Sequence, residues 1–300
     1  MSDKTKAMVW ASFAADSLAL PAHWIYDTEV ISERFGRPDT LKAPWPDSYH
    51  AGKQEGMFTH YGDQALWLLE SVAMKKGFDL YHFARTWKKG FSRYDGYLDR
   101  ATKITLENFA RGLGPEKSGS PSTDLAGAAR IAPIIYHHAG EPARCIAHCR
   151  AQTSMTHSSP AITGCAEFFA SAVLKVLSNK KPTEALLSAK AALPAELVPL
   201  LESGLASADE DTISAIGRFG LSCDVAGAFP AVIHLVAKYQ SDPVEGLVQN
   251  VTAGGDSAAR GMVAGMFFGA FNGMDAVKPN WMSRMKAAPW MATLLDLGLG

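Results

Sequence analysis

The amino-acid sequence predicts an all-α fold, and three observations support this. Apolar residues recur at helical spacing along most of the chain and almost nowhere alternate with a period of two. Hydrophobic residues make up 47% of the 300 residues and charged residues 20%, the balance of a globular protein with a large core. No internal repeat or low-complexity linker divides the sequence. We therefore expect one domain over residues 1–300.

The predicted helices follow one another with short breaks. A stripe of apolar side chains over residues 65–73 and a second over 80–91 each predict an amphipathic helix. A helix start is expected at Asp242, because Asp can cap a helix, Pro243 suits its first turn and Glu245 can bond back to the cap. Further helices are expected over residues 125–137, 161–177, 183–191, 229–239 and 257–271.

Two segments are predicted to be loops. Residues 37–56 contain several prolines and glycines, so they cannot form a long helix, and a loop of this length is often a functional lid. Residues 114–122 form a second, flexible loop. Aromatic side chains near the first loop could stack a nucleobase or pack onto the core; these are Trp24, Tyr26, Trp45 and Tyr49.

Charge and composition exclude several partners. The 29 Lys and Arg residues nearly balance the 30 Asp and Glu residues, giving a net charge of −1, so we expect no nucleic-acid partner. The apolar stretches near residues 8–20 and 262–271 are too short to span a bilayer, so no membrane partner is expected. The first residues lack a secretory leader, and the four cysteines lack a CxxC pair, so we expect a cytoplasmic protein with reduced thiols.

Three segments each contain a carboxylate that could have a structural role or take part in a binding or catalytic site. Asp256 follows two glycines and precedes a helix with glycines at every fourth position, so it can cap the helix, bind a cation, or do both. Asp63 lies at another helix start, and the two aspartates could converge. Asp16 lies inside an apolar helix; if buried it needs a partner, for which we favour a structural hydrogen bond to a helix start.

Five segments, in order, resemble the ADP-ribosylglycohydrolase family. That family opens with a helix reading roughly GDALGxPxE, continues with TDDT at a helix start and a Gly-rich turn before Arg and Pro, then has a Thr-His turn, and closes with GGDTDT before a glycine-spaced helix. The similar segments here are residues 16–23, 61–64, 124–133, 156–157 and 254–269. Residues 94–102 also resemble the family's substrate-facing turn.

The resemblance implies an all-α fold with a central cleft, where two magnesium ions bind the ribose hydroxyls of ADP-ribose beside the scissile bond. Residues 61–64 and 256–259 would supply the metal ligands. Only Asp63 remains in the first segment, and Asp256 and Ser257 in the second, because Ala258 and Ala259 replace oxygen ligands. We therefore expect at most one divalent ion, magnesium before zinc, and consider a full two-magnesium site doubtful.

The sequence thus predicts a hydrolase that cleaves a glycosidic bond to ADP-ribose or a related ribosyl nucleotide, acting on a small-molecule or ADP-ribosylated substrate. The alternative is a non-catalytic, crystallin J1-like protein that keeps the fold. His23 stands where the family has a substrate-facing Glu. The expected site residues are, for catalysis, Asp63, Asp256 and His23; for substrate binding, Asp16, Tyr61, Tyr97, Ala126, Gly127 and His157; and for metal binding, Asp63, Asp256 and Ser257.

Overall fold

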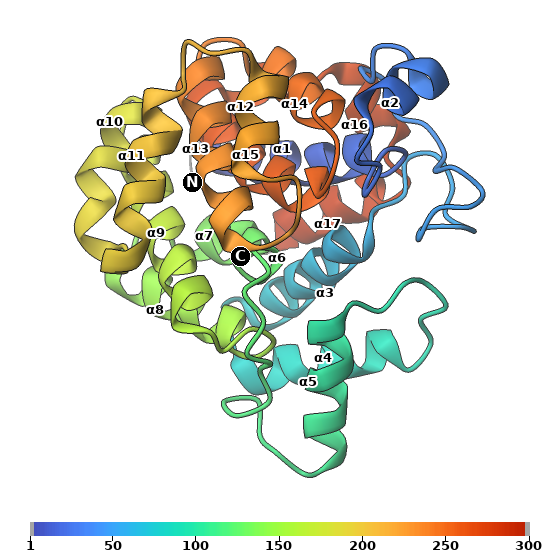
Figure 1. Ribbon diagram of the computed structural model, residues 1–300. Coiled ribbons are helices and arrows are strands. Elements are labelled where there is room, and N and C mark those ends of the chain that lie inside the picture. Colours follow the sequence, from blue (N-terminus) through green and yellow to red (C-terminus); the bar gives the residue numbers. More distant parts are fainter. Residues whose placement is uncertain (1–2, 298–300) are drawn as a thin grey trace.

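A computed structural model describes residues 3–297 and confirms the all-α fold (Figure 1). Within these residues no β-strand forms, and two isolated bridges, Ser120 to His157 and Asp124 to Asp224, join loop segments. The α-helices are α1 (Asp3–Ala19), α2 (Thr28–Phe35), α3 (His60–Lys75), α4 (Leu80–Phe91), α5 (Arg100–Ala110), α6 (Ala126–Ala129), α7 (Ala132–His138), α8 (Pro142–Ser154), α9 (Pro160–Leu177), α10 (Pro182–Ala189), α11 (Val198–Ala206), α12 (Thr212–Phe219), α13 (Val225–Tyr239), α14 (Pro243–Thr252), α15 (Ser257–Asn272), α16 (Pro279–Arg284) and α17 (Ala288–Leu297). Three 3₁₀ helices are η1 (Lys190–Ala192), η2 (Ala195–Leu197) and η3 (Gly273–Ala276).

Helices α1 and α15 pack side by side in the centre of the molecule (Figure 1). Almost every residue of α1 is buried, as expected for a helix that is apolar on all sides. A Cβ atom added at Gly265 would lie 2.5 Å from the carbonyl oxygen of Ala11, and one at Gly269 would lie 2.4 Å from that of Ala7. The glycine spacing therefore allows the two backbones to touch, as the sequence predicts.

The helix predicted over residues 125–137 is wrong as a single element. It is divided into α6 and α7 at Arg130 and Ile131. Pro133 lacks an N–H group and favours a first turn over a helix interior, so a new helix begins at this point. The helix predicted from residue 229 begins earlier, at Val225, because Asp224 caps it through the N–H of Ala226.

The other predicted helices are confirmed within a few residues, including the start at Asp242, whose side chain accepts from the N–H of Glu245. Glu245 does not bond back to the cap. Its carboxylate instead pairs with Arg37 at the beginning of the long loop.

Residues 37–56 contain no helix, as predicted. The loop is anchored on α16, because the carbonyl oxygen of Asp39 accepts from the indole N–H of Trp281 at 2.8 Å and its carboxylate pairs with Lys278 at 3.0 Å. Residues 114–122 are also irregular. Ser118 ties them to the end of α8 by donating to the carbonyl oxygen of Met155 at 2.8 Å.

Among residues 3–297, α9 is long and apolar enough to cross a membrane by length and composition. However, 67% of that window is buried against the rest of the chain, which is the environment of a core helix. The four cysteines are free, with Cys145, Cys149 and Cys165 buried and Cys223 partly exposed.

Candidate functional site

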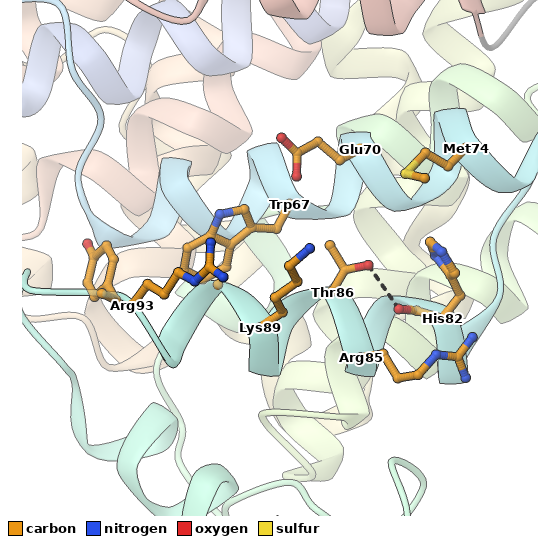
Figure 2. A pocket seen from close by; sticks show the side chains of 10 residues that line it. Trp67, Glu70, Met74, His82, Arg85, Thr86, Lys89 and Arg93 are labelled. Atoms are coloured by element: carbon orange, nitrogen blue, oxygen red, sulfur yellow. Dashed lines mark hydrogen bonds between the residues drawn. The ribbon is translucent and has the colours of Figure 1, made fainter.

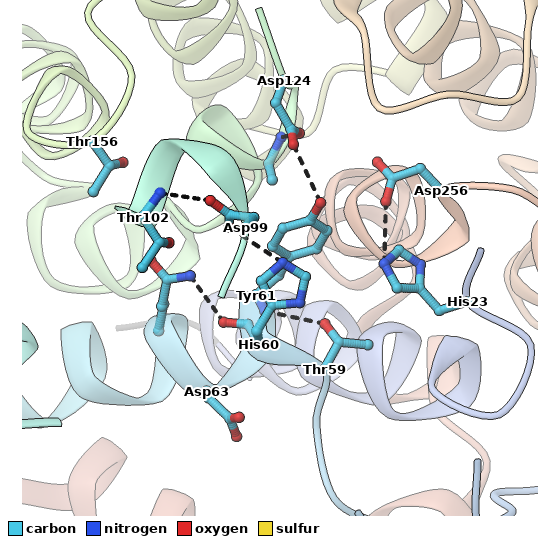
Figure 3. A network of polar contacts seen from close by, with 12 residues as sticks. His23, Thr59, His60, Tyr61, Asp63, Asp99, Thr102, Asp124, Thr156 and Asp256 are labelled. Carbon is cyan, nitrogen blue, oxygen red and sulfur yellow. Dashed lines mark hydrogen bonds and ion pairs between the residues drawn. The ribbon is translucent and has the colours of Figure 1, made fainter. Parts of the chain in front are cut away.

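The first turns of α3, α5 and α15 meet beside the segment that follows α1 (Figure 3). Two backbone hydrogen bonds hold that segment against the start of α15: the N–H of Trp24 donates to the Gly255 carbonyl at 2.9 Å, and the N–H of Gly255 donates to the Ile25 carbonyl at 2.7 Å. Gly255 has φ of +66° and a Cβ there would strike the carbonyl of Leu221, so only glycine fits this turn. The turn brings Asp256 to the site.

Asp16 binds the start of α3. Its carboxylate accepts from the N–H of Thr59 at 2.8 Å and from the hydroxyl of Thr59 at 2.6 Å. Asp16 is fully buried, and burial, opposed by the two bonds from Thr59, raises the pKa of its carboxyl to about 6. The structural hydrogen bond favoured from the sequence is therefore confirmed, and the substrate contact expected of Asp16 stays a prediction.

The N-cap of α3 also corrects the alignment of the second motif. Thr59 caps α3 by accepting from the N–H of Tyr61. A TDDT segment at a helix start therefore corresponds to residues 59–62, two residues before the expected position. His60 and Tyr61 occupy the places of its two carboxylates, and Asp63 lies outside the motif.

Asp63 binds two partners away from the other site residues. Its carboxylate pairs with the ammonium of Lys53 and accepts from the hydroxyl of Tyr94 at 2.7 Å. Figure 3 shows the Asp63 side chain pointing away from His60, with Asp256 on the far side of Tyr61. The convergence of Asp63 and Asp256 expected from the sequence is therefore wrong.

Asp256 lies at the N-cap of α15 but makes no capping hydrogen bond. His23 caps the helix instead, since its Nδ1 accepts from the N–H of Ala258 at 3.4 Å, while its Nε2 lies 3.4 Å from the Asp256 carboxylate. Burial and the nearby charge of Asp124 raise the pKa of Asp256 well above its usual range, although Arg260 opposes this. Burial lowers the pKa of His23, so this imidazole is neutral.

Asp99 and His60 form a buried pair. The Asp99 carboxylate lies 3.2 Å from His60 Nε2 and caps α5 by accepting from the N–H of Thr102 at 2.6 Å. Burial alone would raise the pKa of Asp99, but the hydrogen bond and charge of His60, together with the bond from Thr102, hold it well below its usual range. Asp99 is therefore ionised.

Asp124 has the opposite protonation tendency. Its carboxylate accepts from the hydroxyl of Tyr61 at 3.3 Å and from the N–H of Ala126 at 2.8 Å. Desolvation, with repulsion from Asp99 as the second cause, raises the pKa of Asp124 to about 6. The site thus contains one carboxylate that is ionised and one carboxyl that takes up its proton near pH 6.

A cavity of about 250 Å³ is lined by residues 121–123 together with Arg100 and Ile104. These residues are neighbours of Asp99 and Asp124 in the sequence, but neither of the two carboxyl groups lines the cavity.

Three imidazoles lie in a stack at the centre of the site. The ring centroids of His23 and His50 are 5.2 Å apart, and those of His50 and His60 are 5.7 Å apart, with interplanar angles below 30°. Trp24 covers this stack, and the edges of Tyr49 and Tyr97 contact Trp24 at 5.1 and 5.0 Å. Tyr97, expected as a substrate contact, is thus part of an aromatic cover over the imidazoles.

Several buried polar atoms of this site have no hydrogen-bond partner within residues 3–297. Buried polar groups in proteins are nearly always satisfied, so such a cluster indicates a place for water or a polar ligand. The atoms are both ring nitrogens of His50, Nδ1 of His60 and the hydroxyl of Ser257.

The remaining expected residues form one wall of the site. A Cβ atom at Gly127 would lie 2.5 Å from Cγ of His157, so α6 packs against this imidazole. Thr156 bonds both His157 Nδ1, at 2.9 Å, and a guanidinium nitrogen of Arg130, at 2.6 Å. Arg130 also donates to Gln64 and is fully buried, so it orders the wall. Ala126 contributes its N–H to Asp124.

The donors present do not fit the magnesium site that the family resemblance implies. Asp63 is already paired with Lys53, the three imidazoles stack instead of converging, and Ala258 offers only a methyl group. Within residues 3–297, no three His, Cys, Asp or Glu side chains are grouped so that they could hold a metal ion. Magnesium requires several oxygen ligands in octahedral geometry, which these side chains do not supply.

Sequence reasoning missed the roles of His50, Asp99 and Asp124. Asp99 carries a readable signal, because an Asp that precedes Arg-Ala-Thr suits an N-cap. Asp124 begins a segment that the motifs already single out. His50 lies in the proline-rich loop, and no local pattern predicts that it reaches the centre of the site.

Comparisons with known proteins cover almost the whole chain. The model of the family described as ADP-ribosylglycohydrolase matches residues 1–299. Crystallin J1A of Tripedalia cystophora is 23% identical over 299 residues, covering 94% of this chain and 92% of the relative. Crystallin J1B of the same organism is 21% identical over 301 residues, covering 95% and 92%. A solved structure described as "ADP-ribosylglycohydrolase-related protein complex" has a TM-score of 0.80 and 22% identity, covering 99% of this chain and 96% of that one, which supports the fold.

Proposed function

Because this chain belongs to the ADP-ribosylglycohydrolase family, we propose that it hydrolyses a glycosidic bond to ADP-ribose or a related ribosyl nucleotide. The observation that carries the proposal is the pair of carboxyl groups Asp99 and Asp124, whose pKa values are shifted in opposite directions. Two neighbouring carboxyl groups that differ in this way can serve as acid and base in glycoside hydrolysis.

In the proposed reaction, Asp124 donates its proton to the leaving atom as the bond to the anomeric carbon breaks. Asp99 stabilises the positive charge that develops on the ribose, and then accepts a proton from the attacking water. The His60 contact holds Asp99 ionised and oriented. Proton transfer from Asp99 to Asp124 through water restores both groups, so one water molecule is consumed for each bond cleaved.

The buried atoms of His50, His60 and Ser257 that lack partners support a polar ligand in the same place. Ribose hydroxyl groups donate and accept hydrogen bonds and would satisfy such atoms. A purely structural protein gains nothing from leaving them unpaired, because each one costs stability.

A second candidate function is a non-catalytic role of the kind that the name crystallin gives to the two curated relatives. The aromatic cover formed by Trp24, Tyr49 and Tyr97 favours this candidate, because it lies over the imidazoles. In that case the site would be a packed polar core.

Release of ADP-ribose from ADP-ribosylated protein and from small ribosyl nucleotides, followed by chromatography, tests the first proposal. Asp99→Asn and Asp124→Asn should each lower kcat at least about 100-fold, as is typical for loss of general acid or base catalysis. Asp209→Asn, which removes an exposed carboxylate elsewhere, is the matched control and should retain full activity. The far-UV circular dichroism of all three should match that of the wild type.

Binding distinguishes the two candidate functions. If the site binds ribosyl nucleotides, ADP-ribose should raise the melting temperature of the wild type, because a ligand that binds only the folded state stabilises it. The absence of both hydrolysis and a melting shift with ADP-ribose, NAD or nucleotides at millimolar concentration would reject the hydrolase and leave the structural role.

A further inference from the structure

A groove between α3 and α4 lies outside the polar site (Figure 2). It encloses about 540 Å³, the largest volume among the cavities described for residues 3–297. One wall is formed by α3, with Trp67, Glu70 and Met74. The other is formed by α4 and the turn after it.

Three cations line the α4 wall. Arg85 and Lys89 are four residues apart and lie on the same face of α4, and Arg93 lies in the turn that follows the end of the helix at Phe91; all three line the groove. All three are exposed, and none forms an ion pair with another residue of the described chain, 3–297. Like charges at this spacing repel, so the row is unfavourable unless an anion covers it.

The only carboxylate in the groove is held at the opposite rim. Glu70 Oε1 accepts from the indole N–H of Trp290 at 2.7 Å, and Figure 2 shows it on α3, across the groove from Lys89. The hydrogen bond from Trp290 fixes Glu70 to its own wall. The groove therefore has an excess of positive charge on one side, although the whole chain has a net charge of −1.

The floor of the groove is apolar and rigid. A Cβ atom at Gly90 would lie 2.5 Å from Cε2 of Trp67, so the glycine lets the indole lie directly against the backbone of α4. Phe91 and Tyr94 hold this ring with edge contacts at 4.9 and 5.7 Å. Met74, at the far end, is 72% exposed and offers a flexible thioether to an apolar ligand group.

We propose that this groove binds a short acidic peptide segment of a partner protein, with its carboxylates on Arg85, Lys89 and Arg93 and a large apolar side chain on Trp67 and Met74. The positive charge on the α4 wall favours an acidic ligand, and the apolar floor favours a ligand that also carries an apolar side chain. A nucleic-acid backbone is a poorer match, because it requires a long basic track and would meet Glu70.

Fluorescence anisotropy with labelled ten-residue peptides tests the proposal. The probes combine Glu with Leu, Phe or Trp in alternating and in four-residue spacing; the comparison peptides carry Gln or Lys in place of Glu. We expect the Glu peptides to bind at least ten times more tightly than the Gln peptides, to weaken with added salt, and to outcompete a single-stranded oligonucleotide of equal charge.

Two triple variants give the decisive comparison. The variant with Arg85→Gln, Lys89→Gln and Arg93→Gln should lose at least tenfold in affinity. The matched variant with Lys180→Gln, Lys181→Gln and Lys286→Gln has the same change in net charge, lies outside the groove, and should bind as the wild type does. Equal loss in both variants, no binding of any Glu peptide at millimolar concentration, or tighter binding of the oligonucleotide would overturn the proposal.

Discussion

Asp16 in the last turn of α1 and Thr59 at the start of α3 are joined by two short hydrogen bonds, both accepted by the buried carboxylate. Thr59 therefore caps α3 and also satisfies a buried acid from another helix. Thr59→Ala should lower the free energy of unfolding by about 2 to 4 kcal/mol, because it removes a cap and leaves a buried carboxylate without one donor. Thr59→Ser keeps both functions and should lose less than about 1 kcal/mol. Urea denaturation measures the difference, and equal losses would contradict this role.

The pH dependence of hydrolysis should follow Asp124. Because the proposed acid must carry its proton and its pKa is raised to about 6, kcat should fall as the pH rises through this value. Asp124→Asn should remove this limb along with most of the activity. A rate that keeps rising between pH 6 and 8 would assign the acid to another group.

The glycines of α15 allow a direct comparison of close packing with open surface. Gly265→Ala and Gly269→Ala should each lower the free energy of unfolding by several kcal/mol, about 3 or more, because the added Cβ would strike backbone atoms of α1. Gly217→Ala on α12, where the added Cβ meets nothing within 4 Å, should instead raise stability by about 0.5 to 1 kcal/mol. Thermal denaturation of the three variants checks both signs; a stabilising change at Gly265 would show that α1 and α15 are not in contact.

Buried histidines should make the fold sensitive to acid. Burial lowers the pKa of His50 and His157 to about 3, whereas the unfolded value is about 6.5. Below pH 6.5 these histidines become protonated in the unfolded chain but stay neutral in the folded protein. Their titration therefore leaves the free energy of unfolding unchanged above pH 6.5 and lowers it as the pH falls from 6.5 towards 3. Asp16 and Asp124 act in the opposite sense, since their raised pKa of about 6 favours the fold below pH 3.8 and opposes it above pH 6.

Seven histidines have a lowered pKa and four aspartates a raised one, so the histidines outnumber the acids. The histidines are His23, His50, His82, His138, His148, His157 and His234, and the acids are Asp16, Asp63, Asp124 and Asp256. The free energy of unfolding should therefore fall from pH 6.5 to 4.5. His50→Gln should reduce this slope by up to about 1.4 kcal/mol per pH unit, the value for one proton. Urea denaturation at several pH values measures it, and a stability that rises on acidification would contradict the neutral state of these histidines.

Divalent ions should bind weakly. Because Lys53 already neutralises Asp63, and Asp256 faces His23, we expect titration calorimetry with magnesium, manganese or zinc to reveal at most one weak site. Lys53→Met frees the Asp63 carboxylate and serves as the comparison; it should bind magnesium no more weakly than the wild type. Two tight magnesium ions would show that the site rearranges around metal.

The sequence predicts the fold well because the helical spacing of apolar residues and of glycines is a local pattern, which does not depend on how the helices pack. It predicts the site less well. The position of the TDDT motif depends on which residue caps α3, and this follows from the hydrogen bond that Thr59 accepts from the N–H of Tyr61. His50 lies in a proline-rich loop that has no periodic pattern. Its contacts in the imidazole stack therefore cannot be predicted from the sequence. Helices α2, α5 and α12 are each capped by an Asp, and this residue indicates the helix start in the sequence. None of the three helices has a long apolar stripe.

The pairing of α1 with α15 has a consequence for synthesis of the chain on the ribosome. Helix α1 is made first, yet the surface that covers it, residues 257–272, is made about 250 residues later. At roughly 5 to 20 residues per second, a helix that is buried along almost its whole length in the folded protein waits on the order of ten seconds or more for its partner. During this interval its surface is open to other nascent chains, so the yield of folded protein should depend on chaperones that shield the emerging N-terminal segment.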